Sequence, residues 1–325
     1  MLRYIVKRIL FMIPVLFGVT LIVFSLMYIT PGDPASMLLG DGATAEAIAE
    51  KREELGLNDP YAVQLFNYVK GVVTEVDLGT SYRTKQPVID EILSRLPNTL
   101  RLSAYSMVLA TLIGLVTGIV SATKQYSKMD VTATGVALFG VSMPPFWLGL
   151  MLILVFSVKL RLLPSAGIDT WKAWIMPTIT LGTCVAGIIM RQTRSSMLEV
   201  MRQDYIRTAR SKGQKEITVI MKHAFRNALM PIVTVIGMQF GSLLAGAVLT
   251  ETIFSISGLG KYMVDSIKNK DFPAVQGTVL FVAFMCTLIN LLIDIFYTFI
   301  DPRIRTQFAA KAGVLFKRKK VDSHG

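Results

Sequence analysis

Six long apolar runs constrain this chain more than any other feature of its sequence. Each run has about 18 or more nearly uncharged residues, and about 20 helical residues cross the hydrocarbon core of a bilayer. The runs are residues 9–29, 102–122, 131–158, 173–190, 227–250 and 272–293. Hydrophobic residues make up 52% of the 325 residues and charged residues only 17%. The sequence therefore predicts an all-α polytopic membrane protein with six transmembrane helices.

The first run has a basic start, with Arg3, Lys7 and Arg8, as a secretory signal peptide also has. Its apolar stretch is longer than the roughly 7–15 residues of a signal-peptide core. Pro31-Gly-Asp-Pro34 follows it in place of a small-residue cleavage site. We therefore expect this run to remain as the first membrane helix.

The net charge of +12 is distributed unevenly along the chain. The N-terminus, residues 123–130, residues 191–226 and the tail from residue 301 together carry +15, and the segments between them carry −3. Basic residues gather on the cytoplasmic side of membrane proteins. This pattern predicts that both termini lie in the cytoplasm (N-in/C-in). No aromatic-interleaved basic patch accompanies the charge, so we expect the lipid bilayer as a partner and no nucleic acid.

The runs divide the chain into four regions. Residues 1–30 form the N-terminal end and first helix, and residues 31–98 form an extracytoplasmic region with helices at 44–55 and 60–73 that caps the bundle. Residues 99–305 hold the other spans, with a long cytoplasmic loop at 191–230. Residues 306–325 form a basic cytoplasmic tail.

Small residues and prolines mark where the spans pack. Gly114-x-x-x-Gly118 and Gly237-x-x-x-Gly241 allow helix backbones to approach closely. Pro144-Pro145 interrupts the third run, where the freed carbonyl groups need other partners. A tightly packed bundle with a kink is favoured here over a binding site.

Motifs for catalysis are missing from the sequence. It has no G-x-x-x-x-G-K-[ST] loop for nucleotide phosphates, only two histidines, and two cysteines that both fall inside apolar runs. We therefore expect no catalytic residues and no metal ligands. The one ionisable group inside a span is Asp294, one turn after Asn290. It suits either a hydrogen-bonded contact near the helix end, which we favour, or an ion relay in a secondary transporter.

The loop between the fourth and fifth runs has the pattern of a basic amphipathic helix. Met197, Leu198, Met201, Tyr205 and Ala209 recur at three- and four-residue steps, with basic residues between them. Gly213 follows, as a glycine does just beyond a helix end. Such a helix either lies on the membrane surface or inserts into a groove of a partner, and the pattern alone does not separate the two.

Residues 204–213, followed by His223-Ala-Phe-Arg-Asn-Ala228 and Pro231, resemble the EAA-type loop of ABC importer permeases. The resemblance is to the B-type subunit of the dipeptide/oligopeptide/nickel permease family and extends over nearly the whole chain. Further matches, in order, are Pro31-Gly-Asp-Pro34, Leu55-Gly-Leu57, Asp77-Leu-Gly-Thr-Ser81, Arg191-x-x-Arg194, Leu249-Thr-Glu-Thr-Ile-Phe-Ser255, Gly258-Leu-Gly260, Asp271-Phe-Pro273 and Asp301-Pro-Arg-Ile-Arg305. The chain departs from the general permease motif at Arg207-Thr208-Ala209, a form associated with the peptide branch, and at Arg226, where the motif has proline. It departs from the pattern of the peptide branch at Ile256-Ser257 and at Val76.

The resemblance implies a type I importer permease fold in the bacterial inner membrane. It implies four kinds of partner: a homologous C-type permease subunit, two cytoplasmic ABC ATPases that bind ATP and Mg, and an extracytoplasmic substrate-binding protein. No cofactor is implied for this chain itself. The expected ATPase-coupling helix contains Asp204, Tyr205, Ile206, Arg207, Thr208, Ala209, Arg210, Lys212 and Gly213. The residues expected to face the binding protein are Glu251, Phe254, Gly258 and Gly260.

The expected function is that of a pore-forming subunit in an ATP-driven importer of di- or oligopeptides, without an ATPase site of its own. The family resemblance leaves two other substrate classes open, nickel chelates and glutathione-like compounds. A secondary transporter that uses Asp294 and a membrane scaffold without transport are the alternatives from other classes.

Overall fold

The computed structural model describes the backbone of residues 2–40 and 42–300. The described part is built of helices and contains no strand, apart from one isolated bridge between Thr80 and Pro87. The longest helices are α1 (Leu2–Ile29), α5 (Val88–Thr123), α8 (Ile175–Met201), α11 (Arg226–Ile253) and α13 (Phe272–Ile300). All five are long and apolar enough to cross a membrane. The all-α polytopic prediction is confirmed.

The third apolar run forms two helical halves with a sharp bend between them instead of one kinked helix. It forms α6 (Lys128–Ser142), α7 (Pro145–Leu152) and the π-helix η1 (Ile153–Lys159), and the two halves meet at 99°. Met143 and Pro144 are extended between them, because a residue before proline avoids the helical conformation and proline has no N–H to donate. The sequence predicted a kink within one helix, whereas the helix ends here, because Met143 and Pro144 each precede a proline.

Helices α5 and α8 pack closely against each other at two glycines of α5. A Cβ at Gly114 would lie 2.7 Å from the Cβ of Ile189, and a Cβ at Gly118 would lie 2.6 Å from that of Thr193. Side chains of α5, α8 and α11 then fill the main buried core around this contact. At the second predicted pair, a Cβ at Gly237 would lie 2.9 Å from Ile293 of α13. Small residues therefore set the helix spacing, as predicted.

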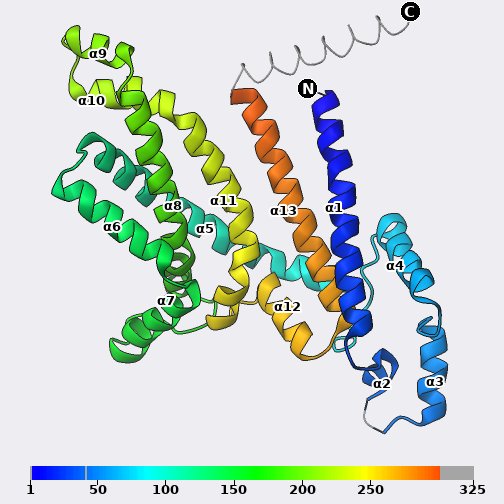
Figure 1. The fold of residues 1–325 in the computed structure, drawn as a ribbon. Coiled ribbons are helices and arrows are strands. Elements are labelled where there is room, and N and C mark those ends of the chain that lie inside the picture. The colour runs from blue at the N-terminus through cyan, green and yellow to red at the C-terminus, as the bar shows by residue number, and fades with distance from the viewer. Residues whose placement is uncertain (1, 41, 301–325) are drawn as a thin grey trace, which may run out of the picture.

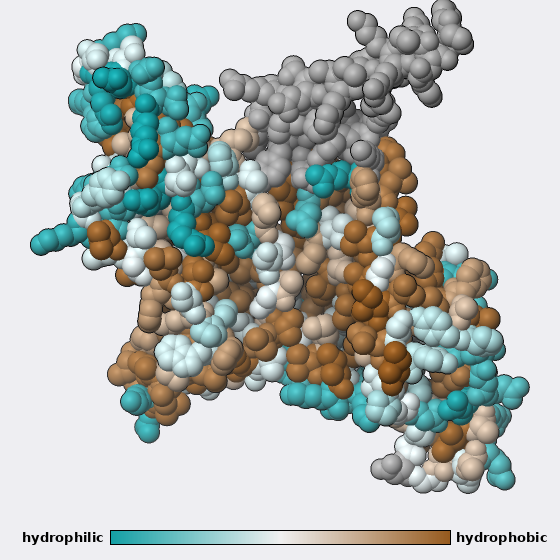
Figure 2. Space-filling model, in the orientation of Figure 1, coloured by the Kyte–Doolittle hydropathy of each residue, from teal (hydrophilic) through white to brown (hydrophobic). Residues whose placement is uncertain are grey.

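The connections gather at two ends of the bundle (Figure 1). At one end, called here the basic end, lie the start of α1, the α5–α6 turn, α9 and α10. At the opposite end lie the short helices α2, α3 and α12, while α4 lies beside the half of α1 that is nearer to this end. Figure 2 shows hydrophilic residues over α9 and α10 and hydrophobic residues over much of the middle of the molecule. The short helices are α2 (Pro34–Leu39), α3 (Ala45–Glu54), α4 (Tyr61–Glu75), the 3-10 helix η2 (Trp171–Trp174), α9 (Asp204–Ser211), α10 (Glu216–Thr218), the π-helix η3 (Val219–Phe225) and α12 (Leu259–Lys268).

The region at the opposite end is folded onto the bundle by polar contacts. Thr44 caps the N-terminus of α3 and Gly56 follows its end at φ +64°, so the predicted bounds hold. Buried Asp271, just before α13, accepts hydrogen bonds from Ser81 Oγ at 2.5 Å and from the backbone N–H of Tyr82 at 3.0 Å. These contacts join segments that are 190 residues apart.

The α5–α8 contact generates a first prediction. We expect Gly118→Ala to lower the free energy of unfolding by about 1–3 kcal/mol, because the added methyl group forces Thr193 and the α8 backbone apart. Gly135→Ala in α6 is the matched control, since nothing lies within 4 Å of a Cβ there. It should be neutral or stabilise by about 0.5–1 kcal/mol. The measurement is unfolding of the purified protein in mixed micelles by circular dichroism, and equal effects of both changes would contradict the prediction.

Candidate functional site

The basic segment between α8 and α11, residues 202–225, is the first candidate site. It contains α9, α10 and η3. The predicted helix over residues 197–212 is divided, because α8 ends at Met201 and Gln203 is extended, with ψ of 148°. The sequence places Asp204 directly after this break, and an acidic residue suits the first turn of a new helix. The division reorients α9 relative to the apolar face of α8.

One face of α9 is buried against the bundle. Ile206 is fully buried and Ala209 nearly so, in an apolar cluster called here the loop cluster. Its buried members are Ala122, Met197, Ile206, Ala209, Val219, Ala224, Ala228 and Ile232. The apolar stripe predicted from the sequence was wrong at Tyr205, which is 45% exposed. After the break that follows Met201, Ile206 and not Tyr205 points into the bundle. The loop cluster makes α9 part of the packed structure of α5, α8 and α11.

The other face of α9 is exposed and largely basic. Among the residues expected to form the coupling helix, those exposed are Asp204, Tyr205, Arg207, Thr208, Arg210, Lys212 and Gly213. Ala209 and Ile206 lie underneath and support this face without forming part of it. The segment thus offers a short, charged surface on a rigid apolar support.

A reversal of the chain between α9 and α10 is held by polar contacts. Gly213 has φ +71°, the left-handed conformation predicted for the residue after the helix. Arg210 Nη2 and Nε donate to the Glu216 carboxylate at 2.7 and 3.2 Å, and these bonds raise the pKa of Arg210 above its ordinary value. His223 Nε2 lies 2.8 Å from Gln214 Oε1, so His223 forms a hydrogen bond within this segment.

Below α9, a buried ion pair connects α6 to α8. Asp130 is 3% exposed, and its two carboxylate oxygens accept from Arg194 Nε and Nη2 at 2.8 and 2.9 Å. Ser121 of α5 also hydrogen-bonds to the carboxylate. Sequence reasoning counted these charges for topology and did not pair them, because the two residues are 64 positions apart. The one available signal was an acidic residue at the start of an apolar run.

At the opposite end, Glu251 organises the turn between α11 and α12. Its side chain is fully buried and accepts from the backbone N–H groups of Gly260 and Lys261 at 2.7 and 3.1 Å. Thr99 Oγ1 of α5 donates to it at 2.6 Å and accepts from Leu259 N at 2.9 Å. Glu251 therefore caps the N-terminus of α12 and fixes it to α5.

The four residues expected to face a binding protein, Glu251, Phe254, Gly258 and Gly260, are all buried within this chain. Glu251 and Phe254 are at most 1% exposed, and both glycines are buried. A Cβ at Gly258 would lie 2.3 Å from the Glu251 carboxyl carbon, and one at Gly260 would lie 2.4 Å from the backbone of Val248. These glycines are explained by close packing within the chain, which a sequence motif does not distinguish from an exposed contact.

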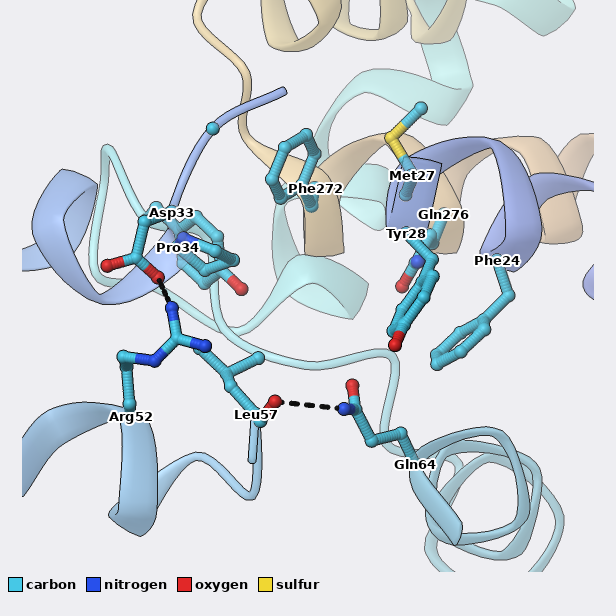
Figure 3. Close-up of a pocket in the computed structure, with 12 residues that line it drawn as sticks. Phe24, Met27, Tyr28, Asp33, Pro34, Arg52, Leu57, Gln64, Phe272 and Gln276 are labelled. Atoms are coloured by element: carbon cyan, nitrogen blue, oxygen red, sulfur yellow. Dashed lines mark hydrogen bonds and ion pairs between the residues drawn. The ribbon is translucent and has the colours of Figure 1, made fainter. Parts of the chain in front are cut away.

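A pocket of about 410 Å³ opens at the opposite end, where α1 ends and α13 begins (Figure 3). The side chains of Phe24, Tyr28 and Phe272 lie on one part of its wall. Across from them, Arg52 Nη1 donates to Asp33 Oδ1 at 2.8 Å. Burial, with the nearby carboxylates of Asp271 and Asp33, raises the pKa of Tyr82 in this wall to about 12. The pocket combines aromatic surface with polar groups whose charges neutralise each other.

The comparisons with known proteins agree with this architecture. Residues 114–306 match the family described as binding-protein-dependent transport system inner membrane component, and residues 1–103 match its N-terminal counterpart. The chain therefore belongs to this family and is a multi-pass protein of the bacterial inner membrane, the membrane subunit of an ABC importer.

Individual relatives are similar along almost their full length. The dipeptide transport system permease protein DppB of Alkalihalophilus pseudofirmus is 46% identical over 94% of this chain and 100% of its own. The glutathione transport system permease protein GsiC of Escherichia coli is 43% identical over 94% of this chain and 99% of its own. An inward-facing structure of the MetNI methionine ABC transporter superposes with a TM-score of 0.58 at 16% identity, over 66% of this chain and 97% of that one, which shows the shared fold.

The buried ion pair yields a second prediction. We expect Asp130→Asn to lower the free energy of unfolding by about 1–3 kcal/mol, since it leaves the partly exposed Arg194 without its carboxylate partner. Asp265→Asn is the control, because the ion pair of Asp265 with Lys261 is more exposed. This change should lower the free energy of unfolding by less than about 1 kcal/mol. Chemical unfolding of the two purified variants checks this, and a larger loss for Asp265→Asn would refute it.

The cap on α12 yields a third prediction. We expect Glu251→Ala to lower the free energy of unfolding by about 2–4 kcal/mol, because three donors at buried or partly buried positions lose their acceptor. Glu251→Gln keeps one acceptor oxygen and should cost less. Glu75→Ala, at an exposed position, is the control. Hydrogen exchange of the α12 amides should rise in the first variant, and unchanged exchange there would count against this role.

Proposed function

We propose that this chain is a pore-forming permease subunit of an ATP-driven importer of di- or oligopeptides. The observation that carries the proposal is the 46% identity to a dipeptide permease, which covers 94% of this chain and all of that protein. A match of this extent includes the spans, the region before α5 and the basic segment together. Family membership favours ATP-driven import over a secondary transporter that uses Asp294, a residue whose side chain lies outside the described part.

The basic end would lie in the cytoplasm. The start of α1, the α5–α6 turn and residues 202–225 share this end, and each carries net positive charge. The positive-inside rule places such segments on the cytoplasmic side. The region of residues 31–98, with eleven acidic and six basic residues, would then face outward.

Residues 202–225 would be the part that a partner ATPase moves. The exposed residues of α9 offer charged and hydroxyl groups for charge-assisted contacts, and Arg207 lies among them. The buried face connects the segment to α5, α8 and α11 through the loop cluster. A displacement of α9 would therefore move these helices. The ATPases would shift the bundle between outward and inward access only through contacts that differ between the two states.

The other components would be supplied by partners. A homologous C-type permease would complete the pore, two ABC ATPases would bind ATP and Mg, and an extracytoplasmic binding protein would deliver the substrate at the opposite end. This chain would hold no nucleotide, in accord with the lack of a Walker A sequence.

A glutathione-like tripeptide is the second candidate substrate, because GsiC is 43% identical over nearly the same range. Both relatives are named for substrates with peptide bonds, so a shared peptide chemistry is the simplest proposal. Nickel chelates remain a competitor to be tested in the same assay.

The experiment uses the complete complex in proteoliposomes of bacterial phospholipids, with radiolabelled dipeptide as substrate. Arg207→Glu should reduce copurification of the ATPases and lower ATP-driven uptake about tenfold or more, because it inverts a charge at the proposed contact. Lys268→Glu, exposed at the opposite end, should leave ATPase copurification unchanged. Uptake of dipeptide that continues without ATPases would sink the proposal. Competition by glutathione or a nickel chelate, without competition by dipeptides, would reassign the substrate.

A further inference from the structure

The turn between α5 and α6 presents an aromatic side chain in an unfavourable backbone conformation. Tyr126 is 84% exposed and has φ +63°. A bulky residue with positive φ is uncommon in proteins, and such residues concentrate where a function requires the geometry. Lys124 and Lys128 beside it are also exposed. The chain thus holds a tyrosine out from the basic end, between two lysines, at a position where glycine would be less strained.

Buried contacts hold this turn in place. The backbone N–H of Tyr126 donates to Asp130 Oδ2 at 2.9 Å, and the same oxygen accepts from Arg194 Nη2 at 2.9 Å. Ser127 Oγ accepts from Asp130 N at 3.3 Å and caps α6. The strained residue is therefore fixed through one carboxylate to α8, the helix that leads into α9.

The turn also adjoins the support of α9. Ala122, in the last turn of α5, belongs to the loop cluster together with Ile206 and Ala209 of α9. Tyr126 follows four residues later. The exposed tyrosine and the exposed face of α9 are thus built on the same apolar cluster, at the same end of the molecule (Figure 1).

We propose that the Tyr126 turn is a second contact for the partner ATPase that binds α9. This inference rests on the proposed function of residues 202–225. Tyrosine is a frequent anchor of protein interfaces, and the flanking lysines suit an acidic rim on the partner. Two contacts that are both built on the loop cluster would resist rotation of α9 against the bundle. ATPase movement would then displace α5, α6 and α8 together instead of bending α9 alone.

A lipid surface is the competing partner, since tyrosine and lysine are both common where helices leave the bilayer. A headgroup contact is tolerant of side-chain direction and does not require a strained backbone. The carboxylate network fixes the direction of the Tyr126 turn, and this favours a partner with a defined shape.

Photo-crosslinking of the complete complex in vesicles of bacterial phospholipids separates the two partners. The photoreactive p-benzoyl-phenylalanine replaces, one at a time, Tyr126, Arg207 and Leu112, the last of these being 60% exposed on α5. We expect crosslinks to the ATPase from positions 126 and 207, and to lipid from position 112. If position 207 reaches the ATPase while position 126 reaches only lipid, the inference is overturned and the proposed function stands. If neither reaches the ATPase, both are overturned.

Substitution of Tyr126 gives a second, independent readout. Tyr126→Gly removes the side chain and relieves the positive φ, so the melting temperature should stay the same or rise. ATP-driven uptake should nevertheless fall about tenfold, the size expected for the loss of one aromatic anchor. Tyr126→Phe should retain most uptake because it keeps the ring. Uptake by Tyr126→Gly equal to that of the native protein would overturn the inference.

Discussion

The close contact between α5 and α8 is the interaction on which the rest of the molecule depends. Gly114 and Gly118, about one helical turn apart, bring the two backbones together, since a side chain at either position would meet α8. This approach places Ser121 and Asp130 within reach of Arg194. It also brings Ala122, in the last turn of α5, into the loop cluster. Without this spacing, the basic segment would have no common support with the α5–α6 turn.

At each end of the bundle a buried carboxylate joins several segments of the chain. Asp130 accepts from α5, from the following turn and from α8, while Glu251 accepts from α5 and from the first turn of α12. In both cases backbone N–H groups share the carboxylate, so its charge also satisfies donors that a helix terminus or turn leaves unpaired. Asp130 and Glu251 thus each fix both a connection and the packing around it. The long helices between these points are held mainly by apolar contacts.

Sequence patterns were sufficient for the features that depend on local composition. The apolar lengths predicted the spans, Thr44 and Gly56 bounded α3, and Gly213 marked the end of α9. Features that depend on contacts distant in sequence were missed. The break after Met201 follows from the burial of Ile206, and the pairing of Asp130 with Arg194 follows from the α5–α8 spacing. The motif around Glu251 was recognised from the sequence, but the burial of its residues was not, because close packing within the chain and contact with a partner both favour glycine.

The break between α6 and α7 has a consequence for what surrounds this surface. Pro144 and Pro145 supply no N–H groups, and Leu148 is the first residue of α7 whose N–H reaches a helical acceptor, the Pro144 carbonyl at 3.2 Å, so the N–H groups of Phe146 and Trp147 have no carbonyl before them in the helix. In hydrocarbon each such unmatched group costs several kcal/mol. If this break lies at the depth of the hydrocarbon, the dielectric around residues 142–147 has to be higher than that of a lipid tail. Protein or water would then contact this part of the bundle in place of lipid, and the layer of lipid around the bundle would be interrupted there.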